Sequence, residues 1–453
     1  MKIFLFCILF LSLGCLPEVE GVGVKQEALA PSTALDPNFG HSNSELWRAR
    51  GRRNKRYYYY RRRYYGGRRY YYYCKQQPVQ SMPKTPNSGG KDKNGDGEEK
   101  EKDKDKEKKA EAARAATKKQ QEADMPRFDK GENEIFTSKD CYEVVTELGQ
   151  GSFGAVYGVI RQSDKQSFAL KCESCHLKKS MLPHEANVLL ALNLLKSPHF
   201  VEMIDYGTVG DRFLFVIMKC VGKNLWDIRM TLPDRRYTLK TVLRIAEQTL
   251  AGLRDLHRVG YLHRDIKPPN FAIGRDASDM HTIYLLDFGL CRRIVEKGKD
   301  LRTPRRECAF RGTTRYASLA AHDNKDQSRK DDIESWWYMI AEMIIIEIPW
   351  KQKKGTDRDG VRADKQRLRE SDDYFKFLFR KCCYEQMAAI LKYLDSLTYT
   401  SIPDYDYVYH NITAIAVVNK IQPSDPPDWD PDAKRYKGPV YREKQPYIVK
   451  ELE

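Results

Sequence analysis

The chain has 453 residues, which is enough for two or three domains, and its formal net charge is +16. The positive charge favours anionic partners, such as acidic proteins, nucleic acid or membrane surfaces, without choosing among them. The 11 cysteines show no regular disulfide spacing, and the C-x-x-C pair of Cys172 and Cys175 lacks the second pair that a zinc site needs. Ordinary reduced thiols are therefore expected, which argues against a disulfide framework and against a zinc module.

Residues 1–21 have the pattern of a secretory signal peptide. Lys2 precedes an apolar run from Ile3 to Leu16, and small residues follow at the offsets of a cleavage site. The run is too short to span a bilayer comfortably. This pattern predicts the secretory pathway or the extracellular space, whereas the cysteine usage is typical of the cytosol.

Three polar segments follow before any pattern of a folded core. Residues 22–46 are a polar leader, and residues 47–75 are a low-complexity segment of alternating Arg and Tyr runs. Arg and Tyr together suit stacking on bases or binding to anionic surfaces, but such a segment can also be a disordered tail with no single ligand. No firm nucleic-acid or membrane partner follows from it. Residues 76–139 carry too little apolar surface to fold alone, which predicts a charged, disordered linker.

From residue 140 the pattern changes to short apolar strands followed by long amphipathic helices. Phe213 to Met218 is a continuous apolar strand, and Val242 to Leu256 has apolar residues at helical spacing. Strands first and helices after indicate an α+β fold with two lobes over residues 140–430. Residues 431–453 are polar and contain proline, which predicts an irregular tail.

A glycine-rich turn opens this region. Gly149, Gly151 and Gly154, with Val156 after them, can lie close over phosphates and offer backbone N–H donors. The glycines alone are a weak signal, because dinucleotide-binding sites use the same spacing. A dinucleotide site needs a helix directly after the glycines, whereas a strand pattern follows here, so a nucleotide-covering hairpin is favoured.

A lysine and a glutamate follow at positions suited to holding phosphates. Lys171 ends an apolar strand pattern and is a candidate for orienting the α- and β-phosphates of a nucleotide. A lysine in that role needs a carboxylate to keep it in place. Glu185, near the start of the next amphipathic segment, is the candidate, and an exposed helix glutamate is the alternative reading.

Residues 263–270, with the sequence HRDIKPPN, place a carboxylate, an ammonium and an amide in one short loop. Asp265 can accept a hydroxyl proton, Lys267 can neutralise charge on a γ-phosphate, and Asn270 can hold Mg²⁺. Asp287 ends an apolar strand and precedes Phe-Gly, where a second Mg²⁺ ligand is expected. The octet alone could be a basic surface turn. Four motifs in this order and spacing jointly predict phosphoryl transfer from ATP.

The motifs resemble those of eukaryotic serine/threonine protein kinases, and GTTRYAS at 312–318 resembles the casein kinase 1 family. FRG at 310–312, RKDD at 329–332 and IPW at 348–350 resemble the tau-tubulin kinase branch of that family. The resemblance covers residues 140–430. It implies a small β-rich lobe and a larger helical lobe, ATP and Mg²⁺ as cofactors, protein substrates and a monomeric kinase domain.

The resemblance also implies roles for residues outside the motifs described so far. Met218 would be the gatekeeper, and the hinge from Lys219 to Val221 would meet adenine. Thr313 would bridge the catalytic aspartate and lysine, and Asp332 would anchor the catalytic loop.

Arg315 resembles the substrate anion site of the same family. A guanidinium suits a phosphate or a carboxylate, so this residue would favour acidic or already phosphorylated substrates. The alternative is that Arg315 pairs within the activation segment.

The sequence thus predicts a serine/threonine protein kinase. A pseudokinase or scaffold that binds nucleotide or protein without catalysis is the alternative, although none of the catalytic residues is missing. The family resemblance points to the cytoplasm and nucleus, in conflict with the signal-peptide pattern.

Overall fold

The structure is a computed structural model, and the residues that it describes are 59–65, 68–74, 115–128, 131, 133–151, 154–295, 301–345 and 347–443. The expected signal peptide at 1–21 and the polar leader at 22–46 lie outside the described residues, and so do residues 444–453 of the expected tail. The chain divides into two units, residues 1–90 and residues 91–453.

In the first unit, the Arg/Tyr segment contains an antiparallel hairpin of β1 (Tyr59–Tyr65) and β2 (Arg68–Cys74). The register places Tyr65 opposite Arg68 and Tyr59 opposite Cys74. Aromatic residues fit extended backbone well, which is a physical reason for strands in this composition.

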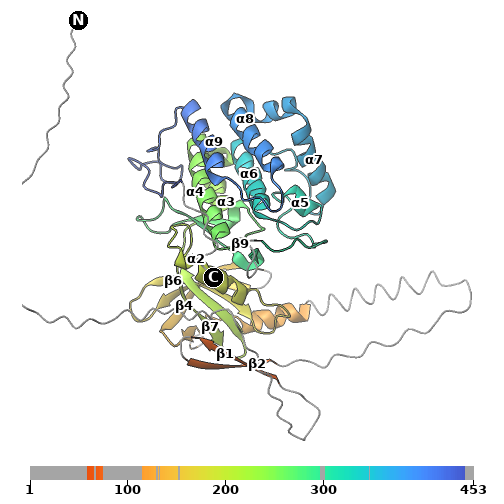
Figure 1. Cartoon of the computed structure of the whole chain (residues 1–453). Coiled ribbons are helices and arrows are strands. Elements are labelled where there is room, and N and C mark those ends of the chain that lie inside the picture. The colour runs from red at the N-terminus through yellow and green to blue at the C-terminus, as the bar shows by residue number, and fades with distance from the viewer. Residues whose placement is uncertain are drawn as a thin grey trace, which may run out of the picture. The chain divides into compact units, whose positions relative to one another are not determined.

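The second unit begins with a six-stranded antiparallel sheet in the order β3-β4-β5-β6-β8-β7 (Figure 1). Helix α2 (Leu182–Leu194) contacts β7 and β8. The strands are β3 (Glu134–Phe136), β4 (Cys141–Gln150), β5 (Gly154–Arg161), β6 (Ser167–Ser174), β7 (Met203–Val209) and β8 (Phe213–Lys219).

The folded part of this unit starts earlier than the expected boundary at residue 140. Residues 115–124 are helical, and Met125 is buried in the hydrophobic core of the sheet. The carboxylate of Asp124 is also buried, and it accepts a hydrogen bond from Ser174 and lies 2.9 Å from His176 Nδ1. Burial opposes ionisation, but these hydrogen bonds lower the pKa of Asp124 below its usual value. The predicted linker at 76–139 is therefore corrected at its C-terminal end.

A helical part follows the sheet, and Figure 1 shows its long helices running side by side. It also contains two short antiparallel strand pairs, β9 (Tyr261–Leu262) with β12 (Arg292–Arg293) and β10 (Phe271–Ile273) with β11 (Ile283–Leu285). Its helices are α3 (Leu225–Thr231), α4 (Leu239–Arg258), α5 (Leu319–His322), α6 (Arg329–Ile345), α7 (Arg358–Glu370), α8 (Asp372–Ser396) and α9 (Tyr405–Val418). The remaining short elements are η1 (Pro233–Arg235), η2 (Pro268–Asn270) and η3 (Phe288–Leu290). The two-lobed α+β prediction is confirmed.

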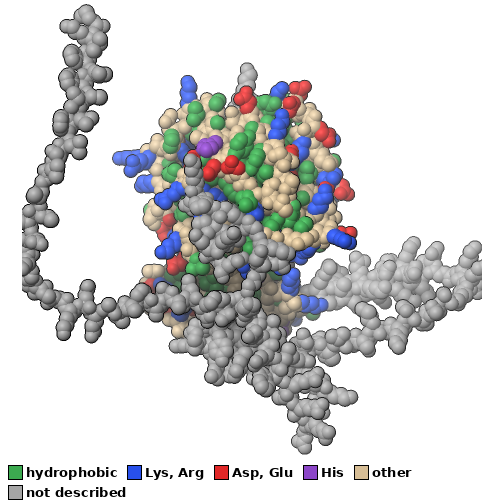
Figure 2. Space-filling model, in the orientation of Figure 1, with side chains coloured by type: hydrophobic (Ala, Val, Ile, Leu, Met, Phe, Trp, Pro, Cys, Tyr) green, Lys and Arg blue, Asp and Glu red, His purple; other side chains and the backbone are tan. Residues whose placement is uncertain are grey.

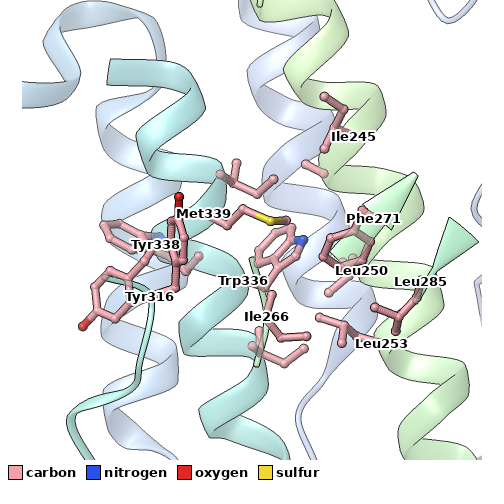
Figure 3. Close-up of a cluster of buried hydrophobic side chains, with 14 of the residues drawn as sticks. Ile245, Leu250, Leu253, Ile266, Phe271, Leu285, Tyr316, Trp336, Tyr338 and Met339 are labelled. Carbon is pink, nitrogen blue, oxygen red and sulfur yellow. The ribbon is translucent and has the colours of Figure 1, made fainter. Parts of the chain in front are cut away.

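The core of the helical lobe lies between α4 and α6 (Figure 3). Trp336 and Trp337 have 0% of their surface exposed, and Trp336 Nε1 donates a 2.8 Å hydrogen bond to Thr249 Oγ1 of α4. Large aromatic groups buried in this way typically contribute about 3–5 kcal/mol each when compared with alanine. Helix α6 is thus a rigid base for the loops that lie next to it. Among the described helices, none has both the length and the apolar character that a bilayer crossing requires.

The residues after 430 pack against α4. Tyr441 N–H donates a 2.9 Å hydrogen bond to Glu247, and the Arg254 guanidinium lies 4.6 Å from the centre of the Tyr441 ring. Residues 431–443 contain neither helix nor strand. On the face shown in Figure 2, basic and acidic side chains are interspersed over the helical lobe.

Candidate active site

Lys171 and Glu185 form an ion pair between the sheet and α2. Lys171 Nζ lies 2.6 Å from Glu185 Oε2 and 3.3 Å from Asp287 Oδ1. The lysine comes from β6, which β5 and β8 flank, and the glutamate comes from the first turn of α2. Burial opposes the charge on Lys171, but the two carboxylates raise its pKa above the usual value. The site therefore holds a fixed ammonium that can meet phosphate oxygens.

The glycine-rich turn joins β4 to β5. Gly154 has no room for a side chain, because a Cβ atom there would lie 1.8 Å from the carbonyl oxygen of Cys172. A Cβ atom at Gly149 would meet open space, and one at Gly151 would make an ordinary 3.7 Å contact with the carbonyl oxygen of Gly154. Val156 lies opposite Lys171 in the register of β5 and β6, so the strand that follows the glycines is paired directly with the strand that carries the lysine.

The hinge follows β8. Met218 is paired with Ala169 in the strand register, and Lys219 N–H donates to the carbonyl of Glu202 at 2.9 Å. Lys219 Nζ is itself paired with Asp279 at 2.7 Å. In the part of the chain that the structure describes, Val221 N–H has no hydrogen-bond partner, so it remains available as a donor to an adenine ring.

The catalytic loop converges on one carboxylate. Asp265 is 7% exposed, and Lys267 Nζ lies 2.6 Å from its Oδ2 atom. Thr313 Oγ1 donates to Asp265 Oδ1 at 2.8 Å, and Asn270 Nδ2 donates to the Asp265 backbone carbonyl at 2.8 Å. The structure brings all four predicted catalytic residues together.

Asp332 of α6 fixes the backbone of this loop. Its carboxylate accepts backbone hydrogen bonds from His263 at 2.7 Å and from Arg264 at 2.8 Å, and His257 Nε2 lies 2.9 Å from it. Arg264 has a φ of +67°, an unfavourable angle for a residue with a side chain. Because the two N–H donors are bound to one buried carboxylate, the strained loop keeps its shape.

Asp287 lies at the end of the strand β11 region and has a φ of +64°. Its side chain is 50% exposed, and although burial works against its charge, Lys171 and His263 lower its pKa. An ionised, accessible carboxylate is a suitable Mg²⁺ ligand. The amide nitrogen of Asn270 is engaged by the loop, which leaves its oxygen as the donor atom that a cation needs. Both residues therefore offer oxygen donors that suit a divalent cation such as Mg²⁺.

Gly312 makes the contact between the activation segment and the catalytic loop possible. Its φ is +94°, and a Cβ atom there would lie 2.5 Å from the carbonyl oxygen of Arg264. Only glycine fits this close approach without strain. The next residue, Thr313, is thereby brought within reach of Asp265.

Arg315 does not stand free in the activation segment. Its guanidinium lies 3.3 Å from Glu342, a buried residue of α6, and donates to the carbonyl of Lys351 at 3.3 Å. Glu342 also accepts a 2.6 Å hydrogen bond from Tyr316 and lies 3.5 Å from Arg229. The arginine remains partly exposed, but an incoming anion would compete with Glu342.

Two features of the site, the surroundings of Arg264 and the place of Lys365, could not be read from the motifs. Arg264 is buried close to two other arginines. Burial, and then the positive charge of Arg311 and Arg292, lower its pKa to about 10. Lys365 of α7 is buried beneath the activation segment. Neither feature has a local sequence pattern, because each depends on residues distant in the chain.

The described part of the chain also contains a cavity of about 460 Å³. Arg305, Lys330, Glu334 and Tyr399 are among its lining residues, and none of the lining residues belongs to the constellation around Asp265. This cavity therefore lies apart from the residues around Asp265.

Comparison with known proteins gives matches over this same region. A family model described as protein kinase domain matches residues 142–396. Serine/threonine-protein kinase spe-6 of Caenorhabditis elegans is 31% identical over 306 residues, which are 67% of this chain and 79% of that protein. A Dictyostelium discoideum protein that carries serine/threonine-protein kinase in its name is 33% identical over 64% of this chain, and the chain spans 57% of its length. A C. elegans protein with casein kinase I in its name is 34% identical over 48% of this chain and 63% of that protein.

Proposed function

Because the chain belongs to the protein kinase family, we propose that it transfers the γ-phosphate of ATP to serine or threonine hydroxyls of protein substrates. The observation that carries this proposal is the convergence of Lys267, Asn270 and Thr313 on Asp265. A carboxylate with one oxygen held by an ammonium and the other by a hydroxyl suits the task of orienting an acceptor hydroxyl.

The geometry supports the following roles. Lys171, fixed by Glu185, would orient the α- and β-phosphates, and Val221 N–H would meet adenine. Asp265 would accept the proton of the attacking hydroxyl, and Lys267 would neutralise charge on the phosphate in transit. ATP with Mg²⁺ supplies the phosphoryl group and the divalent charge. Positioning and electrostatics therefore account for the rate enhancement, without a covalent enzyme intermediate.

A narrower proposal is that the chain belongs to the casein kinase 1 family and its tau-tubulin kinase branch. The run GTTRYAS at 312–318 supports the family, as does the similarity to a C. elegans protein with casein kinase I in its name. The runs FRG at 310–312, RKDD at 329–332 and IPW at 348–350 support the branch. Within it, Arg315 would favour acidic or already phosphorylated substrates. Arg315 already pairs with Glu342, so an anionic group of the substrate would have to displace the Glu342 carboxylate to bind it.

A phosphate-transfer assay tests the general proposal. The purified full chain is incubated with radiolabelled ATP, Mg²⁺ and casein, beside the Asp265→Asn variant. We expect transfer by the wild type, and in Asp265→Asn a loss of at least about 100-fold, the range for removing a general base. ATP binding, measured by calorimetry, should survive in the variant.

Two results would count against this proposal. Full activity of Asp265→Asn would reject the assignment of the base. A wild-type chain that binds ATP but transfers nothing would instead support the scaffold alternative.

A further inference from the structure

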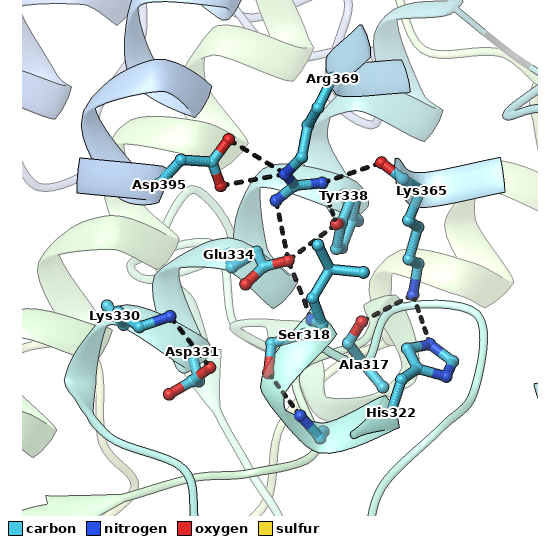
Figure 4. A network of polar contacts seen from close by, with 12 residues as sticks. Ala317, Ser318, His322, Lys330, Asp331, Glu334, Tyr338, Lys365, Arg369 and Asp395 are labelled. Carbon is cyan, nitrogen blue, oxygen red and sulfur yellow. Dashed lines mark hydrogen bonds and ion pairs between the residues drawn. The ribbon is translucent and has the colours of Figure 1, made fainter. Parts of the chain in front are cut away.

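Lys365 of α7 lies inside the protein directly beneath the activation segment. It is 0% exposed, and its Nζ atom donates to the carbonyls of Thr314 at 3.1 Å and Ala317 at 2.6 Å. The third neighbour is His322 Nε2 at 3.2 Å (Figure 4). The lysine thus binds both ends of a short turn that follows Thr313.

Two aromatic rings complete this environment. Lys365 Nζ lies 4.5 Å from the centre of the Tyr338 ring and 5.4 Å from that of Trp350. Trp350 Nε1 in turn donates to the carbonyl of Arg315 at 2.8 Å. Burying an amine destabilises the folded protein unless the amine has polar partners, and here two carbonyls, one imidazole nitrogen and two aromatic rings surround it. Burial lowers the pKa of Lys365, because the amine is shielded from water.

The turn is also tied to Thr313. The Thr313 carbonyl accepts 3.0 Å hydrogen bonds from Tyr316 N–H and Ala317 N–H. A shift of the Ala317 carbonyl toward or away from Lys365 therefore moves the backbone of Thr313. The hydroxyl of Thr313 contacts Asp265, so the position of the turn reaches the catalytic carboxylate.

A second cation on the same face of α7 holds the next part of the segment. Arg369, one helical turn beyond the lysine, lies 3.0 Å from Glu334 and 3.0 Å from Asp395 (Figure 4). Glu334 accepts a 3.1 Å hydrogen bond from Leu319 N–H, at the start of α5. Helix α7 thus supplies one anchor to the turn and one anchor to the helix after it.

We propose that Lys365 is a positioning residue that sets the placement of the turn 313–317, and with it the binding of protein substrate and the rate of transfer. It touches neither nucleotide nor reacting atoms and acts through Thr313. The inference rests on the proposed kinase activity for its kinetic consequences. Its structural consequence, the order of the turn, does not depend on that activity.

The test compares Lys365→Met with Arg367→Met in the full chain. Methionine keeps the length and the ring contacts of the lysine but removes the donors, whereas Arg367 lies on the same helix with 65% of its side chain exposed. In Lys365→Met we expect kcat to fall and KM for casein to rise, so that kcat/KM drops about tenfold, because the buried carbonyls of Thr314 and Ala317 lose their donor. KM for ATP should stay within twofold. A merely structural defect would instead lower the amount of active enzyme without this split.

Amide hydrogen exchange gives a readout that needs no catalysis. Peptides covering 312–319 should exchange at least about tenfold faster in Lys365→Met than in Arg367→Met, while peptides of α9 stay unchanged. Unchanged exchange at 312–319 overturns the inference, whatever the wild-type activity. If wild-type enzyme transfers no phosphate, the proposed function fails and the exchange result still decides the role of Lys365. If Lys365→Met does not fold, Lys365→Gln, which keeps a donor, takes its place in the same two measurements.

Discussion

Thr313 Oγ1 donates a 2.8 Å hydrogen bond to Asp265 Oδ1, although 48 positions separate the two residues in the chain. The contact joins the activation segment to the catalytic loop. It leaves the other carboxylate oxygen to Lys267, so the aspartate is held from both sides. The placement of the Asp265 carboxylate therefore depends on a segment that lies outside its own loop.

Removal of the Thr313 hydroxyl should slow transfer without weakening ATP binding. In Thr313→Val, the carboxylate of Asp265 loses one donor, and a hydrogen bond to a charged group corresponds to about a tenfold change in kcat. Thr313→Ser keeps the hydroxyl and serves as the control. Steady-state kinetics with casein measure the effect, and a kcat for the valine variant within twofold of wild type would show that the contact is not used.

A methyl group at Gly154 should destabilise the small lobe. It would lie 1.8 Å from the Cys172 carbonyl, so β5 and β6 must separate. We expect Gly154→Ala to lower the free energy of unfolding by at least about 1–3 kcal/mol, the usual cost of overpacking. Gly149→Ala has open space around it and should be nearly neutral. Urea denaturation compares the two, and equal stabilities would contradict the close strand approach.

His322 should make the protein sensitive to mild acid. Burial, and then the positive charge of Lys365, Arg358 and Arg362, lower the pKa of His322 to about 3. The unfolded chain, with an ordinary histidine pKa near 6.5, takes up the proton first, so the free energy of unfolding falls as pH drops below about 6.5. This one group contributes a slope of about 1.4 kcal/mol per pH unit in that window.

The variant His322→Gln should therefore show a shallower decline between pH 6.5 and pH 5. His410→Gln is the matched control, because the His410 side chain is 58% exposed. Buried His199 and His257 have lowered pKa values as well, so part of the decline should remain. Urea midpoints across this pH range measure the slopes, and identical slopes for wild type and His322→Gln would reject a neutral buried ring.

Arg315 should matter more for phosphorylated peptides than for unmodified ones. In Arg315→Gln we expect the ratio of kcat/KM between a pre-phosphorylated peptide and its unmodified form to fall about fivefold, because a charge-assisted contact is lost. Arg367→Gln controls for general loss of charge. A ratio that stays the same would leave Arg315 as a partner of Glu342 alone.

Much of the fold and the reactive centre was predictable because the signals are local. The loop 263–270 carries three of its functional groups within eight residues, and an apolar strand brings Asp287 to its place. The pairing of Lys171 with Glu185 also followed from local order, since the strand β6 and the first turn of the next helix, α2, follow each other in the chain.

Other parts depended on partners that no local pattern names. The folded part begins near residue 115 because a single buried methionine, Met125, and one buried carboxylate, Asp124, attach a highly charged segment to the sheet. The average composition of the segment is highly charged, so it does not reveal single residues that attach it to the sheet. The role of Arg315 was open between two readings, and the structure adds a partner that no motif names, since its guanidinium lies 3.3 Å from Glu342.

The sequence by itself determined which chemical groups this protein carries and the order in which they occur: glycines, a lysine, a carboxylate loop and a strand-end aspartate. Tertiary structure alone decided how the activation segment is held against that loop. Lys365 shows the reason, because it lies about fifty residues beyond the carbonyls that it binds and reaches them only once α7 has packed beneath the turn. Contacts between distant segments depend on the packing of whole elements, and periodicity and spacing along a chain do not encode which carbonyl a buried amine will meet.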